Sequence, residues 1–213
     1  MGSAAYDRIK LELIVHPKER IGFQREDFSV LQGKEWGAVV EHLLSLMEKG
    51  AAYSEQLEWL LGADYIDVLE ERLRSSAPGS HGLVYLPYFL YKKTHEFKYL
   101  QRMMQEIVKA DPAWEGREMG ISYLRQLIGG QPIFWDFCRF ILLNVKEFIM
   151  KDSAMTWLAK EKGYLQDDLE LPDELAECLE RLVASNGADQ VAIAVLNRIH
   201  CDSGTFIYPL KEA

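Results

Sequence analysis

Histidine, cysteine and acidic side chains that stand together are the first place to look for chemistry. The chain has 213 residues with five histidines and three cysteines, and His200, Cys201 and Asp202 follow one another directly. A thiolate nucleophile needs an imidazole beside it in space. Neighbouring side chains point to opposite faces of a strand and diverge by about 100° in a helix, so this triplet is poorly arranged for a catalytic dyad.

The familiar signatures of cofactor and metal sites are missing from the sequence. The chain has no GxGxxG, GxxxxGK[ST], GxSxG or HExxH pattern. Its histidines and cysteines do not form the spaced pairs that a structural zinc site requires. We therefore predict no catalytic residue, no cofactor and no metal site.

One acid–base pair lies in the most apolar segment, residues 132–150. Asp136 and Arg139 are three apart, a spacing that places two side chains on one face of a helix. They could form a polar site in the core or a salt bridge at the outer edge of the helix, and we favour the salt bridge. The polar residues of the segment fall on one arc, so we expect a single central helix from Pro132 to Met150.

A run of acidic residues without a basic one extends from residue 167 to residue 180. It lacks the alternating oxygen ligands and the central glycine of a calcium loop. Asp173, Glu177 and Glu180 would share one face of a helix, opposite its leucines. This face is either simply solvated or a docking surface that attracts a basic partner by electrostatic steering.

The stretch HGLVYLPYFLYKKTHEFKYL, residues 81–100, combines aromatic residues with lysines. It could be buried core from which lysine side chains reach outward, a patch that binds a protein segment or a groove for single-stranded nucleic acid. We favour the core first and the protein-binding patch second. In the second case Tyr85, Tyr88 and Tyr91 would supply the contact area.

The charge distribution argues against nucleic acid as a ligand. The formal net charge is −9, with 14 basic and 16 acidic residues in 1–110 and 10 basic and 17 acidic residues in 111–213. Nucleic-acid binders need clustered Lys and Arg. No apolar run reaches the roughly 18 residues of a membrane span, so we expect no direct membrane insertion. The three scattered cysteines fit a reducing cytoplasm better than a disulfide framework.

Most of the chain has the hydrophobic period of helices, and two segments differ. RIKLELIV, residues 8–15, alternates as a half-buried strand does, and TFIYPL, residues 205–210, is a second strand candidate. The segment between Asp189 and His200 could form a helix or a strand, and we favour a helix. The loop SSAPGSHG at 75–82 is a flexible joint or a domain boundary.

These patterns predict a mainly α protein of the α+β type, a helical domain with a small antiparallel sheet from the N- and C-terminal segments. We expect residues 1–213 to form a single domain, with 75–82 as the candidate sub-boundary. The predicted function is a non-enzymatic protein-binding module. It would be an acidic helical adaptor or chaperone, or a neutralising inhibitor, whose partner protein carries a basic or amphipathic segment.

The alternative is an enzyme whose site is assembled from scattered polar residues. A deep pocket with converging polar groups would favour the enzyme, and a broad apolar patch or groove would favour the binding module. The predicted partner-binding residues are Tyr85, Tyr88, Tyr91, Asp173, Glu177 and Glu180.

Overall fold

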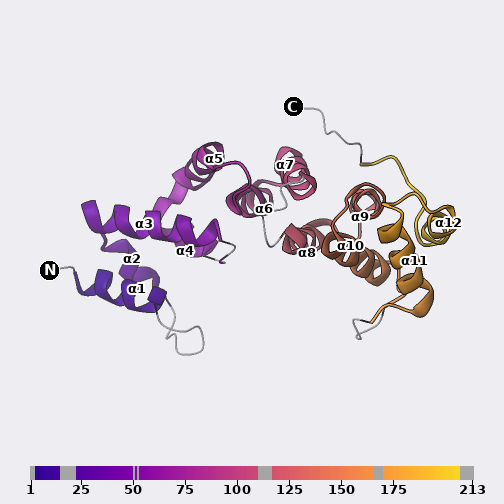
Figure 1. The fold of residues 1–213 in the computed structure, drawn as a ribbon. Helices are drawn as coiled ribbons and strands as arrows, with labels where there is room; N and C mark the ends of the chain where they lie inside the picture. The colour runs from indigo at the N-terminus through magenta and orange to yellow at the C-terminus, as the bar shows by residue number, and fades with distance from the viewer. Residues whose placement is uncertain are drawn as a thin grey trace. The chain divides into compact units, whose positions relative to one another are not determined.

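The structure is a computed structural model that describes residues 3–14, 23–49, 51, 53–109, 117–165 and 170–206. Within them the chain is mainly helical, as predicted (Figure 1). Contacts divide it into two compact units, Met1–Lys93 and Thr94–Ala213, and the loop predicted as a sub-boundary lies inside the first unit. The single domain stays a prediction, because grouping by contacts does not measure independent folding.

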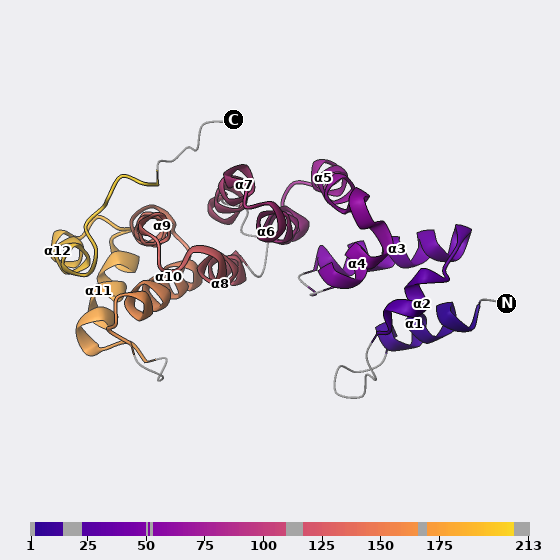
Figure 2. The same ribbon diagram turned by 180° about the vertical axis from the view of Figure 1, so that it is seen from behind.

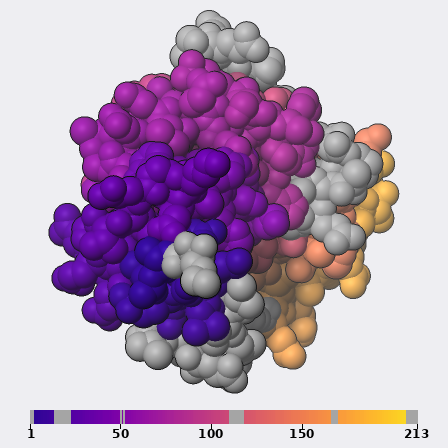
Figure 3. All heavy atoms as spheres, turned by 90° about the vertical axis from the view of Figure 1, so that its left-hand side faces the viewer, coloured from indigo at the N-terminus to yellow at the C-terminus, as the bar shows by residue number. Residues whose placement is uncertain are grey.

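The first unit is a series of helices joined by short connections. They are α1 (Ala4–Ile14), α2 (Arg25–Ser29), α3 (Gly33–Met47), α4 (Ser54–Leu61), the 3-10 turn η2 (Gly62–Asp64), α5 (Tyr65–Ser75) and α6 (Gly82–Thr94). Figure 3 views this unit with the indigo of its N-terminal helix next to the purple of the helices that follow. Its core includes the fully buried Leu43 and Met47 of α3 and Leu57 of α4.

The first predicted strand is wrong, because residues 8–14 belong to helix α1. Ala5 is 5% exposed and Ile9 is 1% exposed, whereas Leu11 is 60% exposed. Ile9 and Leu11 would share a face in a strand, but they lie about 200° apart around a helix. The alternating pattern of this segment therefore belongs to a helix in which Leu11 is exposed to solvent.

The predicted antiparallel sheet is not supported, since no strand occurs in the part of the chain that the structure describes. Of the second strand candidate, Thr205 and Phe206 are irregular. Residues 207–210 lie outside the described residues. The preference for helix between Asp189 and His200 is confirmed, because α12 (Gln190–Ile199) lies there. Its N-cap Asp189 accepts a hydrogen bond from the Ala192 N–H at 2.8 Å.

The second unit is built from helices that pack on their sequence neighbours. They are α7 (Phe97–Val108), α8 (Arg117–Ile128), α9 (Pro132–Asn144), α10 (Phe148–Glu161), α11 (Asp173–Ala184) and α12. Connections of about three residues on both sides of α9 favour antiparallel neighbours. Helix α10 packs on α8, α9 and α11, and Figure 2 shows these helices together from behind.

The helix expected from Pro132 to Met150 is in fact two helices. The backbone is extended at Val145 and Glu147, and the Asn144 side chain donates a hydrogen bond to the Phe140 carbonyl oxygen at 2.9 Å. Such local bonds compete with helix continuation. The prediction of a core helix is correct for α9, whereas Phe148, at the start of α10, is 58% exposed.

Two close contacts fix the C-terminal end of α11 against α9 and α10. The fully buried Lys151 of α10 donates a hydrogen bond to the Leu182 carbonyl oxygen at 2.7 Å, and burial lowers the pKa of this ammonium group. At Gly187, with φ of +88°, a Cβ atom would lie 2.0 Å from the Leu143 carbonyl oxygen. Only glycine fits such an approach, so these contacts hold the end of α11 close to its two neighbours.

Candidate functional site

The acidic face predicted from the sequence lies on α11. Asp173, Glu177 and Glu180 are all exposed, while the leucines of the helix are buried. The predicted arrangement of charged and apolar faces is therefore confirmed, and the partner-binding role of the three acids stays a prediction.

Most of the charge around α11 has no local counter-charge. Residues 170–206 contain seven acidic residues, two arginines and no lysine, a formal charge of −5 within a total of −9. Glu177 pairs with Arg181 at 3.0 Å, and Glu174 pairs with Arg198. No ion pair to Asp173 or Glu180 occurs among the described residues. The segment therefore has a negative field that attracts cationic groups.

The predicted aromatic contact surface is largely core. Tyr85 and Tyr88 on α6 are 7% and 6% exposed, Tyr91 is half-buried, and burial raises the pKa of the Tyr88 phenol. These tyrosines belong to the first unit, whereas the acidic face belongs to the second. Their burial fits the core interpretation of residues 81–100, and their role in partner binding stays a prediction.

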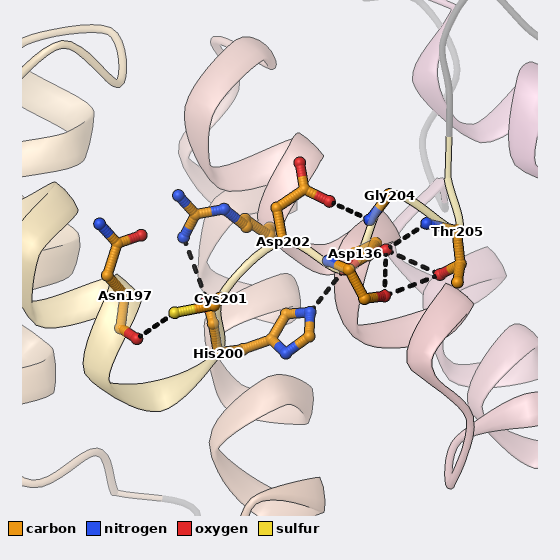
Figure 4. Close-up of polar contacts among 9 residues, drawn as sticks. Asp136, Asn197, His200, Cys201, Asp202, Gly204 and Thr205 are labelled. Carbon is orange, nitrogen blue, oxygen red and sulfur yellow. Dashed lines mark hydrogen bonds and ion pairs between the residues drawn. The ribbon is translucent and has the colours of Figure 1, made fainter.

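The densest polar cluster is one that the sequence did not reveal, and its centre is the Asp136 carboxylate of α9. This side chain is 1% exposed. It accepts hydrogen bonds from His200 Nε2 at 2.6 Å, from the Ser203 N–H at 2.9 Å and from the Thr205 N–H at 2.8 Å. The hydroxyl groups of Ser203 and Thr205 each donate one more at 2.7 Å. One buried carboxylate thus receives five bonds (Figure 4).

The donors come from residues 200–206, which we call the strap. A turn brings them to one point: Asp202 accepts a hydrogen bond from the Gly204 N–H at 2.8 Å, and Gly204 has φ of +71°. The strap ends on an aromatic contact, because the Phe206 ring lies 5.1 Å from Phe137 and 5.3 Å from Phe140 between ring centroids. The strap therefore joins α9 through one carboxylate and one aromatic cluster.

The predicted salt bridge between Asp136 and Arg139 is not formed among the described residues. Asp136 is turned to the strap, and Arg139 donates from Nη1 to the His200 carbonyl oxygen at 3.2 Å. Both side chains hold the same segment. The sequence signal that could have pointed here is an acid within an apolar helix together with two hydroxyl residues near the end of the chain.

Hydrogen bonding decides the ionisation of Asp136. Burial works against the charged form, but the bonds from Ser203, Thr205 and His200 outweigh it and hold the pKa of this carboxyl well below its usual range. The charge of Asp136 also acts on Lys162, whose Nζ lies 3.2 Å from the centroid of the Trp135 ring. Burial lowers the pKa of Lys162, and the charge of Asp136 opposes that shift.

The arrangement is suited to holding a segment and does not form a nucleophile and its base. In a serine–histidine–aspartate triad the hydroxyl donates to the imidazole, whereas here the Ser203 hydroxyl donates to the carboxylate. The Cys201 thiol faces away and donates to the Asn197 carbonyl oxygen at 3.2 Å (Figure 4). Cys178 is buried, and burial raises the pKa of its thiol to about 11.

A second polar region is an open hollow in the first unit, about 710 Å³ in volume. It has lining groups of both signs, and Arg72 is already paired with Glu48 at 2.8 Å and Glu41 at 3.0 Å. A Cβ atom on Gly82 would lie 3.2 Å from Glu48 Cγ. The glycine at position 82 therefore leaves room for the Glu48 side chain. The negative charges that pair with Arg72 come from Glu48 and Glu41 of the protein itself.

Within the described ranges, no group of three or more His, Cys, Asp and Glu residues is placed to hold a metal ion. Among the helices that those ranges contain, none combines the length and the apolar character needed to cross a membrane. Comparison with protein-family models, with curated proteins and with solved structures yields no match to this chain.

Proposed function

We propose that this chain is a non-enzymatic protein-binding module that uses the acidic face of α11. The observation that carries the proposal is the formal charge of −5 in residues 170–206, with Asp173, Glu177 and Glu180 all exposed. The partner it fits is a protein with a basic or amphipathic segment. The module would act as an adaptor or chaperone, or as a neutralising inhibitor of that partner.

The physical basis is long-range attraction followed by local pairing. Surface charges raise the association rate of an oppositely charged partner, and this steering is screened beyond about 10 Å at 0.1 M salt. The two arginines near this face are already paired with Glu174 and Glu177. Among the described residues Asp173 and Glu180 take part in no ion pair. A basic partner would therefore bind these two carboxylates without first breaking a salt bridge.

We place this binding in the cytoplasm, a compartment that suits free thiols. Cys138, Cys178 and Cys201 are all unpaired. The alternative function is an enzyme whose site is assembled from scattered polar residues, and such a site needs polar groups that converge on a substrate. At the Asp136 cluster the hydroxyl groups and the imidazole instead share one acceptor, so the binding module is the function we put forward.

The test reverses the charge of the acidic face. A variant with Asp173→Lys, Glu177→Lys and Glu180→Lys is compared with a control that reverses the exposed Glu55, Asp67 and Glu71 of the first unit. Both variants have the same net charge. Proteins captured from native lysate by the unaltered chain are identified, and each association rate is measured against salt concentration.

We expect the α11 variant to slow association of the true partner at least about tenfold at low salt, with the difference shrinking as salt rises. The control variant should change the rate much less, because its charges lie elsewhere. The proposal fails if the two variants slow association equally or if neither does.

A further inference from the structure

We propose that Asp136, Phe137 and Phe140 of α9 form a docking site for a short peptide segment of another protein that makes the same turn as the strap, and that the strap is the internal ligand of this site. The segment that fits contains a hydroxyl residue, a glycine, a second hydroxyl residue and a phenylalanine in succession, because Gly204 has φ of +71°. Ser203 to Phe206 of the strap have this pattern. The site uses none of the acidic residues of α11 and does not depend on their role.

The Asp136 carboxylate recognises backbone as well as side chains, as a peptide site must. Two of its five bonds come from the N–H groups of Ser203 and Thr205, and two come from their hydroxyl groups. Bonds to a charged acceptor are stronger than neutral ones, and their geometry fixes the position of a turn in the bound chain. Any segment with hydroxyl residues at the same spacing can repeat these four bonds.

Phe206 supplies the apolar part of the recognition. Its side chain is 7% exposed, and it lies edge-on to Phe137 and Phe140. An aromatic anchor in a pocket next to a polar contact is a usual source of binding energy at interfaces. The site therefore combines directed polar bonds with an aromatic contact.

The strap is held by its bonds to Asp136, by Arg139 at the His200 carbonyl oxygen, by the Cys201 thiol at Asn197 and by the Phe206 ring. Because these contacts involve side chains and not a helical hydrogen-bond ladder, the strap can leave without unfolding a helix. Residues 201–205 are exposed and irregular. Helix α12 ends before them at Ile199, where the His200 N–H completes the last turn by donating to the Leu196 carbonyl oxygen at 2.9 Å. Exposed segments outside regular secondary structure open at lower free energies than core helices do.

The strap is covalently attached to α12, and this attachment sets how tightly a competing segment must bind to displace it. A ligand attached by a short linker has a local concentration in the millimolar range. A free peptide with the same contacts therefore does not displace the intact strap at micromolar concentration. A partner must either present the segment within a larger interface or meet a strap that has been weakened.

The experiment uses the full chain and a synthetic peptide of residues 200–206 in which serine replaces the cysteine. The strap-weakened variant has Ser203→Ala, Thr205→Ala and Phe206→Ala. Strap release is followed by a nitroxide label on Cys201, the one exposed thiol of the three. Peptide affinity is measured by calorimetry, and circular dichroism checks that each variant is folded. Phe206→Ala alone is the second variant if the triple one does not fold.

We expect the label to be immobile in the unaltered chain and mobile in the weakened variant. The weakened variant should bind the peptide at least about tenfold more tightly than the unaltered chain, because the internal competitor is gone. Adding Asp136→Asn should lower this affinity about tenfold or more, and so should replacing the phenylalanine of the peptide with alanine.

Three results would overturn the proposal. The label could stay immobile in the weakened variant, which would show that the strap does not leave. The peptide could bind the folded, weakened variant no better than the unaltered chain. Binding could also survive both Asp136→Asn and the loss of the peptide phenylalanine, which would place it elsewhere. None of these results concerns the charge-reversal test of α11.

Discussion

Helices α9 and α11 both have prominent carboxylates and use them in opposite ways. Asp136 of α9 is buried and receives five hydrogen bonds, whereas Asp173, Glu177 and Glu180 of α11 face solvent. A buried acceptor contributes to stability through directed bonds whose loss leaves donors unsatisfied. Exposed acids contribute little stability but create a field at a distance. The same group therefore holds the strap in one helix and faces solvent in the other.

The largest effect should come from the core on which the strap lies. Phe137 is fully buried, so Phe137→Ala should lower the free energy of unfolding by about 3–5 kcal/mol. Phe148 is 58% exposed, and Phe148→Ala should cost much less, on the order of 1 kcal/mol or below. Urea unfolding of both variants measures the difference, and equal losses would mean that α9 is not the core helix described here.

A smaller effect is expected when only the charge of Asp136 is removed. Asp136→Asn keeps the shape but weakens the bonds to the strap, and we expect a loss of about 1.5–3 kcal/mol at neutral pH. Its folded-state pKa lies below the unfolded value, so its contribution is present above the unfolded pKa of about 3.9 and is lost as pH falls toward the folded pKa.

Unfolding free energies between about pH 6 and pH 3 measure this dependence. The unaltered chain should lose stability toward acid more steeply than Asp136→Asn does. Glu180→Gln is the matched control on α11 and should follow the unaltered chain within about 0.5 kcal/mol. Parallel curves for the unaltered chain and Asp136→Asn would contradict the assignment of a depressed pKa to this carboxyl.

The smallest effect is expected at the surface pair of α11 and α12. Arg198 and Glu174 are 63% and 64% exposed at their side chains, and exposed pairs contribute from about 0 to 1 kcal/mol. Arg198→Ala should therefore leave stability nearly unchanged, with any loss disappearing at high salt. Urea unfolding measures this loss of stability. A loss as large as that of Asp136→Asn would contradict the view that the exposed charges of α11 contribute little to stability.

Local pattern was enough to predict several elements. The leucine face opposite the acids predicted α11, and the preference for helix between Asp189 and His200 predicted α12. The same reasoning failed for residues 8–15, because a short helix with exposed Leu11 has the apolar alternation of a strand. It also joined α9 to α10, because residues 144–147 contain no Gly or Pro and Asn144 alone is a weak signal for a break.

The sequence by itself determined the helical class, the acidic character and the outward face of α11, because each depends on residues within a few positions of one another. Only the tertiary structure decided what Asp136 does, because its donors stand 64 to 69 residues further along the chain. It also decided that Tyr85 and Tyr88 are buried. Burial and hydrogen-bond partners depend on which distant segments come together, and no local period contains that information.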